Sequence, residues 1–166
     1  MEVKYLLDSN IFIQAHRMHY PFDVVPSFWN KLIDLSNKGI IGSIDKVKKE
    51  LCETNNPDLL SEWCEDILPK DFFANTTTCA SAYAEIAIWT GTNTQFTQGA
   101  IEEFLTTDLA DPWLIAYAKQ HKLTIVTHEV SQPLRRNKIK IPEPCNHFNV
   151  TFLSPIEMLR ALGEKL

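Results

Sequence analysis

The chain has 166 residues, of which 45% are hydrophobic and 22% are charged, and its formal net charge is −5. This composition is ordinary for a globular protein, and we expect one domain over residues 1–166. The acidic balance argues against a protein that coats nucleic acid through bulk charge, although a local basic patch could still hold a strand. The sequence contains neither a signal-peptide pattern nor a stretch approaching the ~20 apolar residues that span a bilayer, so we expect a cytoplasmic protein with no membrane partner.

The four cysteines are widely spaced and form no close pair of the kind that zinc sites use. Cys145 and His147 are near neighbours, but nothing nearby completes a set of zinc ligands. We therefore expect reduced and mostly buried thiols at all four positions, which are Cys52, Cys64, Cys79 and Cys145.

The first part of the chain predicts alternating strands and helices. Apolar patterning predicts in order a buried strand, a helix, a very short strand and two helices, over residues 4–7, 26–35, 40–42, 46–53 and 59–67. Gly39 should end the first of these helices, and Ser43 is a plausible N-cap of the second. The run Asn55-Asn56-Pro57 breaks the chain before the third.

The second part begins with helices and ends with strands. Helices are expected over 76–89 and 95–105, followed by a helix with Asp111 at its cap and Pro112 in its first turn. Two strands and a terminal helix complete the pattern, over residues 123–127, 150–153 and 154–162. This alternation predicts an α/β fold with a mainly parallel sheet, and residues 57–105 are expected to form a strand-free helical cluster on one side of it.

Four acidic side chains follow or precede these strands. Asp8 ends the first strand, Glu50 lies on the polar face of the helix after the second, Asp111 opens the helix before the third, and Glu129 follows that strand. In a parallel sheet all four can lie near the carboxyl ends of the strands, where ligands bind. Hard divalent cations prefer oxygen ligands, and grouped acids repel one another without a cation.

Each acid also has a simpler explanation. Asp8 could cap the next helix, Asp111 is a good N-cap whether or not it binds metal, and Glu129 could be an ordinary loop acid. Glu50 could be a solvated partner for Lys46 or Lys49.

Four segments of the chain resemble the PIN-domain nucleases. The opening Leu6–Phe12 is similar to the family's strand followed by Asp, Ser or Thr, and Asn. Glu50-Leu51 resembles its second acidic position, Asp111–Ala116 its third, and Val126–Glu129 its fourth. Glu129 stands where the family usually has Asp.

The resemblance implies a PIN-like three-layer α/β/α fold with four to five short strands. It also implies an endoribonuclease that uses Mg²⁺ or Mn²⁺ held by Asp8, Glu50, Asp111 and Glu129, with water activated by the cation attacking the RNA phosphodiester. The tail at 140–145 resembles a PIN-like subgroup of bacterial toxin–antitoxin systems. The implied partners are an RNA substrate and a cognate antitoxin, with a homodimer left open.

Further residues belong to this predicted site. Ser9, Asn10 and Thr127 would orient carboxylates or phosphate through hydrogen bonds. Asp108 is a competitor to Asp111 or an additional acid, and His128 is close enough in sequence to be a candidate base.

A basic segment could hold the nucleic-acid strand. Basic side chains follow Glu129 and surround Glu50: Arg135, Arg136, Lys138 and Lys140, and Lys46, Lys48 and Lys49. Phosphate contacts from such groups give salt-dependent and largely sequence-independent affinity, with Arg135 and Arg136 as the main candidates. The alternative is a solvated charged loop, which is favoured for the lysines around Glu50, whereas a substrate role is favoured for Arg135 and Arg136.

Two other functions remain open from the sequence. A catalytically degenerate PIN-like module that binds RNA or protein would explain Glu129 in place of Asp. A phosphotransfer enzyme with Asp8 as phosphoacceptor would want a second Asp two residues later, where this chain has Asn10.

Overall fold

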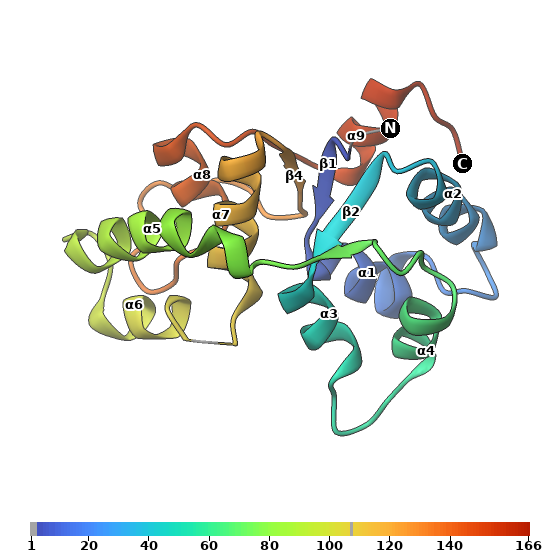
Figure 1. The fold of residues 1–166 in the computed structure, drawn as a ribbon, viewed down its shortest axis with the longest axis horizontal. Coiled ribbons are helices and arrows are strands. Elements are labelled where there is room, and N and C mark those ends of the chain that lie inside the picture. Colours follow the sequence, from blue (N-terminus) through green and yellow to red (C-terminus); the bar gives the residue numbers. More distant parts are fainter. Residues whose placement is uncertain (1–2, 107) are drawn as a thin grey trace.

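The computed structural model describes residues 3–106 and 108–166, and it is built around a parallel β-sheet (Figure 1). Within these residues the sheet has five strands in the order β3-β2-β1-β4-β5, and every neighbouring pair is parallel. The strands are β1 (Tyr5–Leu7), β2 (Ile41–Ile44), β3 (Phe73–Ala74), β4 (Thr124–Val126) and β5 (Phe152–Leu153). The predicted α/β class with a mainly parallel sheet is confirmed.

The strand order reverses beside β1. The chain goes from β1 outward to β2 and β3, then returns to the other side of β1 and continues outward from β4 to β5. β1 and β4 are in register, with Leu7 opposite Val126. Open α/β sheets bind ligands at the carboxyl ends of the strands where the order reverses. In this chain, Asp8 and Thr127 are the first residues beyond those two strand ends.

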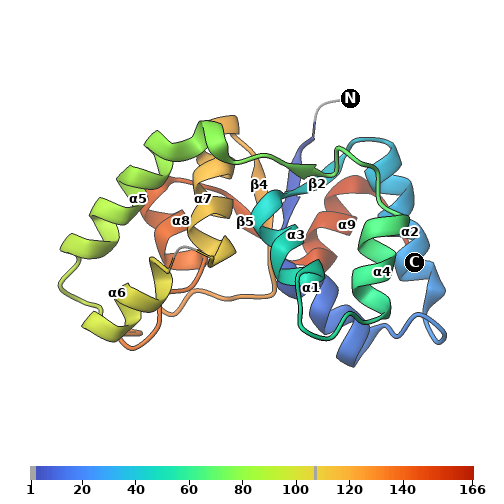
Figure 2. The ribbon, with the colours of Figure 1, turned by 60° about the horizontal axis from the view of Figure 1, so that its bottom comes forward.

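The helices surround this sheet. In chain order they are α1 (Ser9–Gln14), a π-helical turn (Ala15–His19), α2 (Pro26–Asn37), α3 (Asp45–Cys52), α4 (Leu59–Asp66), a 3-10 turn (Thr77–Cys79), α5 (Ala80–Thr92), α6 (Gln98–Phe104), α7 (Ala110–His121), α8 (Pro142–Phe148) and α9 (Pro155–Leu162). Figures 1 and 2 show α5 to α8 on one side of the sheet and α1, α2, α4 and α9 on the other. α3 lies between these groups, beyond the end of β2.

Helix ends follow local sequence signals in most places. Gly39 has a φ of 66° and follows α2, as predicted, because glycine adopts this left-handed conformation without steric cost. Ser43 is not the N-cap of α3: it lies within β2, and Ile44 occupies the cap position. The Ser43 hydroxyl instead donates a 2.6 Å hydrogen bond to the Leu7 carbonyl, which ties β2 to the end of β1.

The stretch 57–105 is mostly helical but differs from the expectation in two respects. It contains β3, a two-residue strand that forms one edge of the sheet, so it is not strand-free. It also divides at that strand: α4 packs against α3, whereas α5 packs against α7 on the other side (Figure 2). The short helix α8 was not predicted from the sequence, although the proline at its start fits the first turn of a helix.

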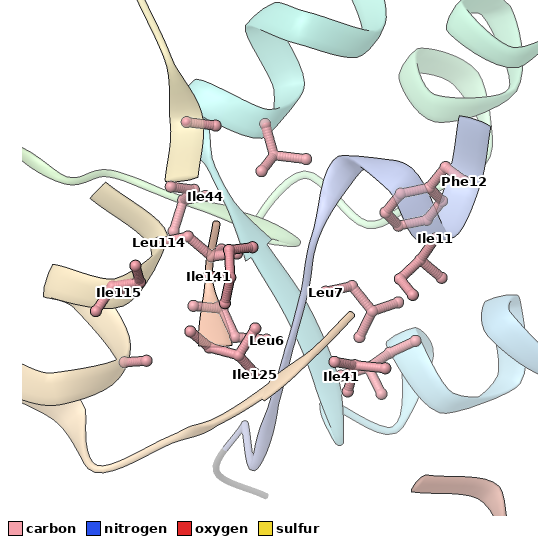
Figure 3. Packing of buried hydrophobic residues seen from close by; sticks show 14 of the residues in the cluster. Leu6, Leu7, Ile11, Phe12, Ile41, Ile44, Leu114, Ile115, Ile125 and Ile141 are labelled. Atoms are coloured by element: carbon pink, nitrogen blue, oxygen red, sulfur yellow. The ribbon is translucent and has the colours of Figure 1, made fainter. Parts of the chain in front are cut away.

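The core lies on both faces of the central strands (Figure 3). Leu6 and Leu7 of β1 are buried, as are Ile125 of β4 and Leu114 and Ile115 of α7. Continuous apolar strands are typical of parallel sheets that are covered by helices on both faces. All four cysteines are free thiols, three of them buried, as predicted. None of the helices in the described part of the chain is long and apolar enough to cross a membrane.

Candidate functional site

Asp8 lies where the strand order reverses and accepts hydrogen bonds from residues just beyond the ends of β1 and β4. Its carboxylate accepts a 3.0 Å hydrogen bond from the Thr127 hydroxyl and a 3.3 Å bond from the Ser9 hydroxyl. The residue is only 1% exposed. Asp8 occupies the N-cap position of α1, yet its side chain makes no capping hydrogen bond. The simpler explanation of Asp8 as a helix cap therefore does not describe what its carboxylate does.

The surroundings of Asp8 disfavour its negative charge. They raise the pKa of its carboxyl to about 6, mainly because burial removes water and then because Glu129 and, more weakly, Glu50 repel the charge. The hydrogen bond from Thr127 opposes this rise in pKa but does not cancel it. An acid that is buried among other acids lacks a compensating positive charge.

Asp111 lies in the first turn of α7, not at its cap. The helix begins at Ala110 with Leu109 at the cap position, so the predicted cap at Asp111 is wrong by two residues. Burial raises the pKa of Asp111 well above its usual value, with repulsion from Asp8 as the next cause, then Glu129 and Glu50. Although a helix N-terminus favours an anion, burial and repulsion outweigh that effect here.

Glu50 joins α3 to the start of α7. Its carboxylate accepts a 3.0 Å hydrogen bond from the backbone N–H of Ala110, one of the amides that a helix leaves free at its N-terminus. Neither neighbouring lysine forms an ion pair with Glu50 in the described residues: Lys49 pairs with Asp108, and Lys46 lies 5.5 Å from the centre of the Trp113 ring. Glu50 is therefore not the solvated ion-pair partner of the alternative explanation.

Glu129 is held by a distant segment of the chain. One carboxylate oxygen accepts a 2.8 Å hydrogen bond from the backbone N–H of Ile141, and the other lies 3.4 Å from the Lys140 ammonium. Its own backbone N–H donates to the Thr127 hydroxyl, and its side chain is only 10% exposed. These contacts distinguish it from an ordinary loop acid.

Asp108 lies apart from the four acids. Its side chain is 70% exposed and forms a 2.8 Å ion pair with Lys49, which keeps the pKa of Asp108 below its usual value. Asp111, by contrast, feels the charges of all three other acids. The structure thus places Asp111, and not Asp108, beside Asp8.

The acids border a hollow of about 380 Å³. Glu50, Asp111 and Glu129 line it together with Asn10, while Asp8 lies buried behind its wall. Two smaller hollows share lining residues with it. One of about 250 Å³ includes Glu50 and Arg17, and the other of about 280 Å³ includes Glu129 and Arg135. Glu50 and Glu129 therefore each border two neighbouring hollows.

The two candidate arginines differ in position. Arg135 lines the hollow next to Glu129, and its Nη1 atom is buried without a hydrogen-bond partner in the described structure. Arg136 is exposed and donates to the carbonyl oxygen of Gln95, away from the acids. His128 lines the same hollow as Arg135, and burial followed by the charge of His19 lowers its pKa.

Two lysines of the hollow were not singled out from the sequence as part of the acid site. Lys138 and Lys140 both line it, and Lys140 also lowers the pKa of Asp111. In the sequence they are only members of a basic run that ends eleven residues after Glu129. Their contact with the acids depends on the path of residues 130–141 back to the end of β4, which no local pattern encodes.

The carboxylate oxygens of the four acids are suitable ligands for a hard cation, but they do not form a compact coordination shell in the described residues. All four acids present carboxylate oxygens, the ligands that Mg²⁺ and Mn²⁺ prefer. Over residues 3–106 and 108–166, however, no three His, Cys, Asp or Glu side chains converge closely enough to form a ready metal cluster. Mutual repulsion spreads like charges, and both Glu50 and Glu129 bind backbone amides.

Two solved structures share the fold over nearly the whole chain. A crystal structure of VapBC2 from Rickettsia felis, bound to a DNA fragment from their promoter, matches at 18% identity and a TM-score of 0.55, covering 92% of this chain and 98% of that one. A structure of FitAB bound to an IR36 DNA fragment matches at 19% identity and a TM-score of 0.55, covering 91% and 94%. Identities this low establish the fold alone, and the predicted PIN-like fold is confirmed.

Comparison by sequence identifies a family but no characterised relative. No curated protein matches the chain. The family described as "Domain of unknown function (DUF4411)" matches residues 5–166, which is almost the entire length. This protein therefore belongs to the DUF4411 family.

Proposed function

We propose that this protein is a metal-dependent endoribonuclease and the toxin of a type II toxin–antitoxin pair. The observation that carries the proposal is the pair Asp8 and Asp111. Asp8, which is buried, and Asp111, which is partly buried and lines the hollow, both have raised pKa values and lie beside the reversal point of the sheet, next to Glu50 and Glu129. Strongly perturbed acids that border a cleft are typical of functional sites.

Stability alone does not account for this grouping. Buried like charges lower the stability of the folded state, and a protein without need of them would carry neutral or apolar residues there. A divalent cation would remove the repulsion among Asp8, Glu50 and Asp111, because their oxygens are hard ligands. We therefore assign Mg²⁺ or Mn²⁺ to these three side chains, with Glu129 as the fourth acid of the site.

The chain's own residues have distinct roles in the proposed reaction. Thr127 and Ser9 orient the Asp8 carboxylate by donating to its two oxygens. Glu50 fixes the start of α7 and thereby the position of Asp111. Arg135, which lines the next hollow beside Glu129, binds an RNA phosphate through its guanidinium group. When bound, the cation supplies a more acidic water and stabilises negative charge that develops on the phosphate.

The biological role is proposed from similarity. The fold is shared with chains of the VapBC2 and FitAB structures, and residues 140–145 resemble a PIN-like toxin subgroup. These similarities support a cognate antitoxin as the protein partner. RNA as the substrate is proposed from the resemblance of the four acidic segments to the PIN-domain nucleases.

The test is RNA cleavage by purified protein with Mn²⁺ or Mg²⁺. Asp8→Asn and Asp111→Asn are each expected to lower the cleavage rate by about 10³-fold, because each removes a charge that holds the cation. Asp108→Asn is the matched control, because it makes the same chemical change in an exposed side chain three residues before Asp111. This variant should cleave RNA at the rate of wild type. Equal rates in wild type, Asp8→Asn and Asp111→Asn would overturn the proposal. Growth arrest on expression, relieved by Asp8→Asn, would support the toxin role.

One observation favours a second function. Both oxygens of Glu129 already have partners within the chain, as they would in a module that has lost its metal and binds RNA or protein. Titration with Mn²⁺ separates the two functions, since a degenerate module would bind none at millimolar concentration.

A further inference from the structure

The contact between Glu129 and Lys140 has an unusual position for an ion pair. It lies on the wall of the central hollow, with the two side chains only 10% and 32% exposed, respectively. The other ion pairs of the described structure have at least one partner more exposed or lie away from the acids. A half-buried pair at the proposed metal site affects what that site can bind.

The lysine is held in place by its neighbours. Ile139 and Ile141, on either side of it, are 4% and 0% exposed, so the backbone there is anchored in the core. The Ile141 amide is also bound to Glu129. The flanking residues are buried, and Lys140 between them lines the hollow, so the anchored backbone sets where this side chain begins.

Glu129 is correspondingly less available to a metal. Its Oε2 accepts from Ile141 and its Oε1 from the Lys140 ammonium, so Glu129, unlike Asp8, has a positively charged partner within the chain. A glutamate is one methylene longer than the aspartate expected at this position, and the extra length lets the carboxylate reach residues 140 and 141. Three carboxylates then remain free of a cationic partner: Asp8, Glu50 and Asp111.

We propose that the Lys140 ammonium takes the place of a second divalent ion in the site. This inference rests on the proposed function. The site then binds a single Mg²⁺ or Mn²⁺ through Asp8, Glu50 and Asp111, while Glu129 positions Lys140. One divalent ion neutralises two of the three remaining negative charges. A second ion would be repelled by the ammonium, which already compensates the charge of Glu129.

The test is the number of Mn²⁺ ions bound by the full chain without RNA, measured by calorimetric titration and by the electron paramagnetic resonance of free Mn²⁺. Wild type is expected to bind one ion. Lys140→Met should bind two, and its first ion about tenfold more tightly, since a nearby positive charge is gone. Lys140→Arg keeps the charge and should bind one ion. A thermal melt of each variant verifies that it is folded.

Lys138→Met is the matched control. Lys138 lines the same hollow, but its ammonium lies 3.3 Å from Glu103, and both of those side chains are more than half exposed. This variant should bind one Mn²⁺ with the affinity of wild type.

The outcomes separate the two proposals. Two ions bound by wild type, or one ion bound by both wild type and folded Lys140→Met with equal affinity, would overturn the role of Lys140 and leave the nuclease proposal intact. No ion bound by wild type at millimolar Mn²⁺ would overturn the metal-dependent nuclease itself, and the role of Lys140 with it.

Discussion

Burial has opposite energetic consequences in two regions of the molecule. One region is the aromatic cluster between α2 and α4, and the other is the group of carboxylates at the ends of β1 and β4. Trp29 is 2% exposed, its ring centre is 4.2 Å from that of Phe22 and 4.9 Å from that of Trp63, and its N–H donates to the Tyr20 carbonyl. Apolar surface is removed from water there, and the indole N–H is satisfied. Asp8 is equally buried, but its charge faces other charges of the same sign.

This difference indicates that the aromatic cluster raises the free energy of unfolding and that the carboxylates lower it. Close packing of aromatic rings favours folding, whereas grouped carboxylates oppose it and are expected where a ligand will compensate. Substitutions in the two regions should therefore change the free energy of unfolding in opposite directions.

The largest effect is expected in the aromatic cluster. Trp29→Ala should lower the free energy of unfolding by about 3–5 kcal/mol, because it removes a large buried side chain and leaves a cavity. Urea unfolding measures this change. Leu134→Ala, at a side chain that is 91% exposed, is the control and should have almost no effect. A loss at Trp29 as small as that at Leu134 would show that the cluster does not stabilise the fold.

The opposite sign is expected at Asp8 in metal-free buffer. Its pKa of about 6 in the folded state exceeds the usual value of 3.8, so the folded state keeps its proton to higher pH. Stability therefore falls as pH rises from about 4 to about 6, and at neutral pH the ionised carboxyl costs on the order of 2–3 kcal/mol. Asp8→Asn should raise stability at pH 7 by roughly 2 kcal/mol, because an amide keeps an acceptor for Thr127 and has no charge to be repelled.

The pH dependence provides a separate measurement. Wild type with a chelator should become more stable as the pH is lowered from about 7 to about 5, and Asp8→Asn should lose part of that gain. Asp111 retains part of the gain, since burial, Glu129 and Glu50 still raise its pKa when the charge of Asp8 is gone. Asp8→Asn less stable than wild type at pH 7, or identical pH profiles, would contradict the contrast between the two regions.

The smallest effect concerns Glu50, which stabilises the start of α7 through a hydrogen bond and also repels the other carboxylates. Glu50→Ala should lower the free energy of unfolding by about 1 kcal/mol, because the Ala110 amide loses its acceptor at the start of α7. Glu50→Gln keeps an oxygen at that place and should be close to wild type in stability, while binding Mn²⁺ more weakly. If Glu50→Ala and Glu50→Gln are equally stable, the carboxylate does not cap α7.

The sequence was a good guide wherever a signal was local. Asp8 and Glu129 follow apolar strands, so their common location at one edge of the sheet follows from the parallel arrangement. The strand β3, in contrast, has two residues, Phe73 and Ala74, which is too short for any alternation to be visible.

Long-range contacts were outside the reach of such patterns. The binding of Glu129 by Lys140 and Ile141 depends on how the loop after β4 returns to the sheet. Likewise, Asp is a residue type that favours a helix cap, but α7 begins two residues earlier than a cap at Asp111 predicts, and the Ala110 amide at its start donates to the distant Glu50.

The shape of the sheet also bears on how this molecule meets other proteins. Its two edge strands, β3 and β5, have two residues each, while the longer strands lie inside. So short an edge offers few free amides and carbonyls to an incoming strand, and it is a poor template for the edge-to-edge pairing that leads to aggregation. A protein that binds this molecule is therefore expected to recognise the side chains on its helices and loops.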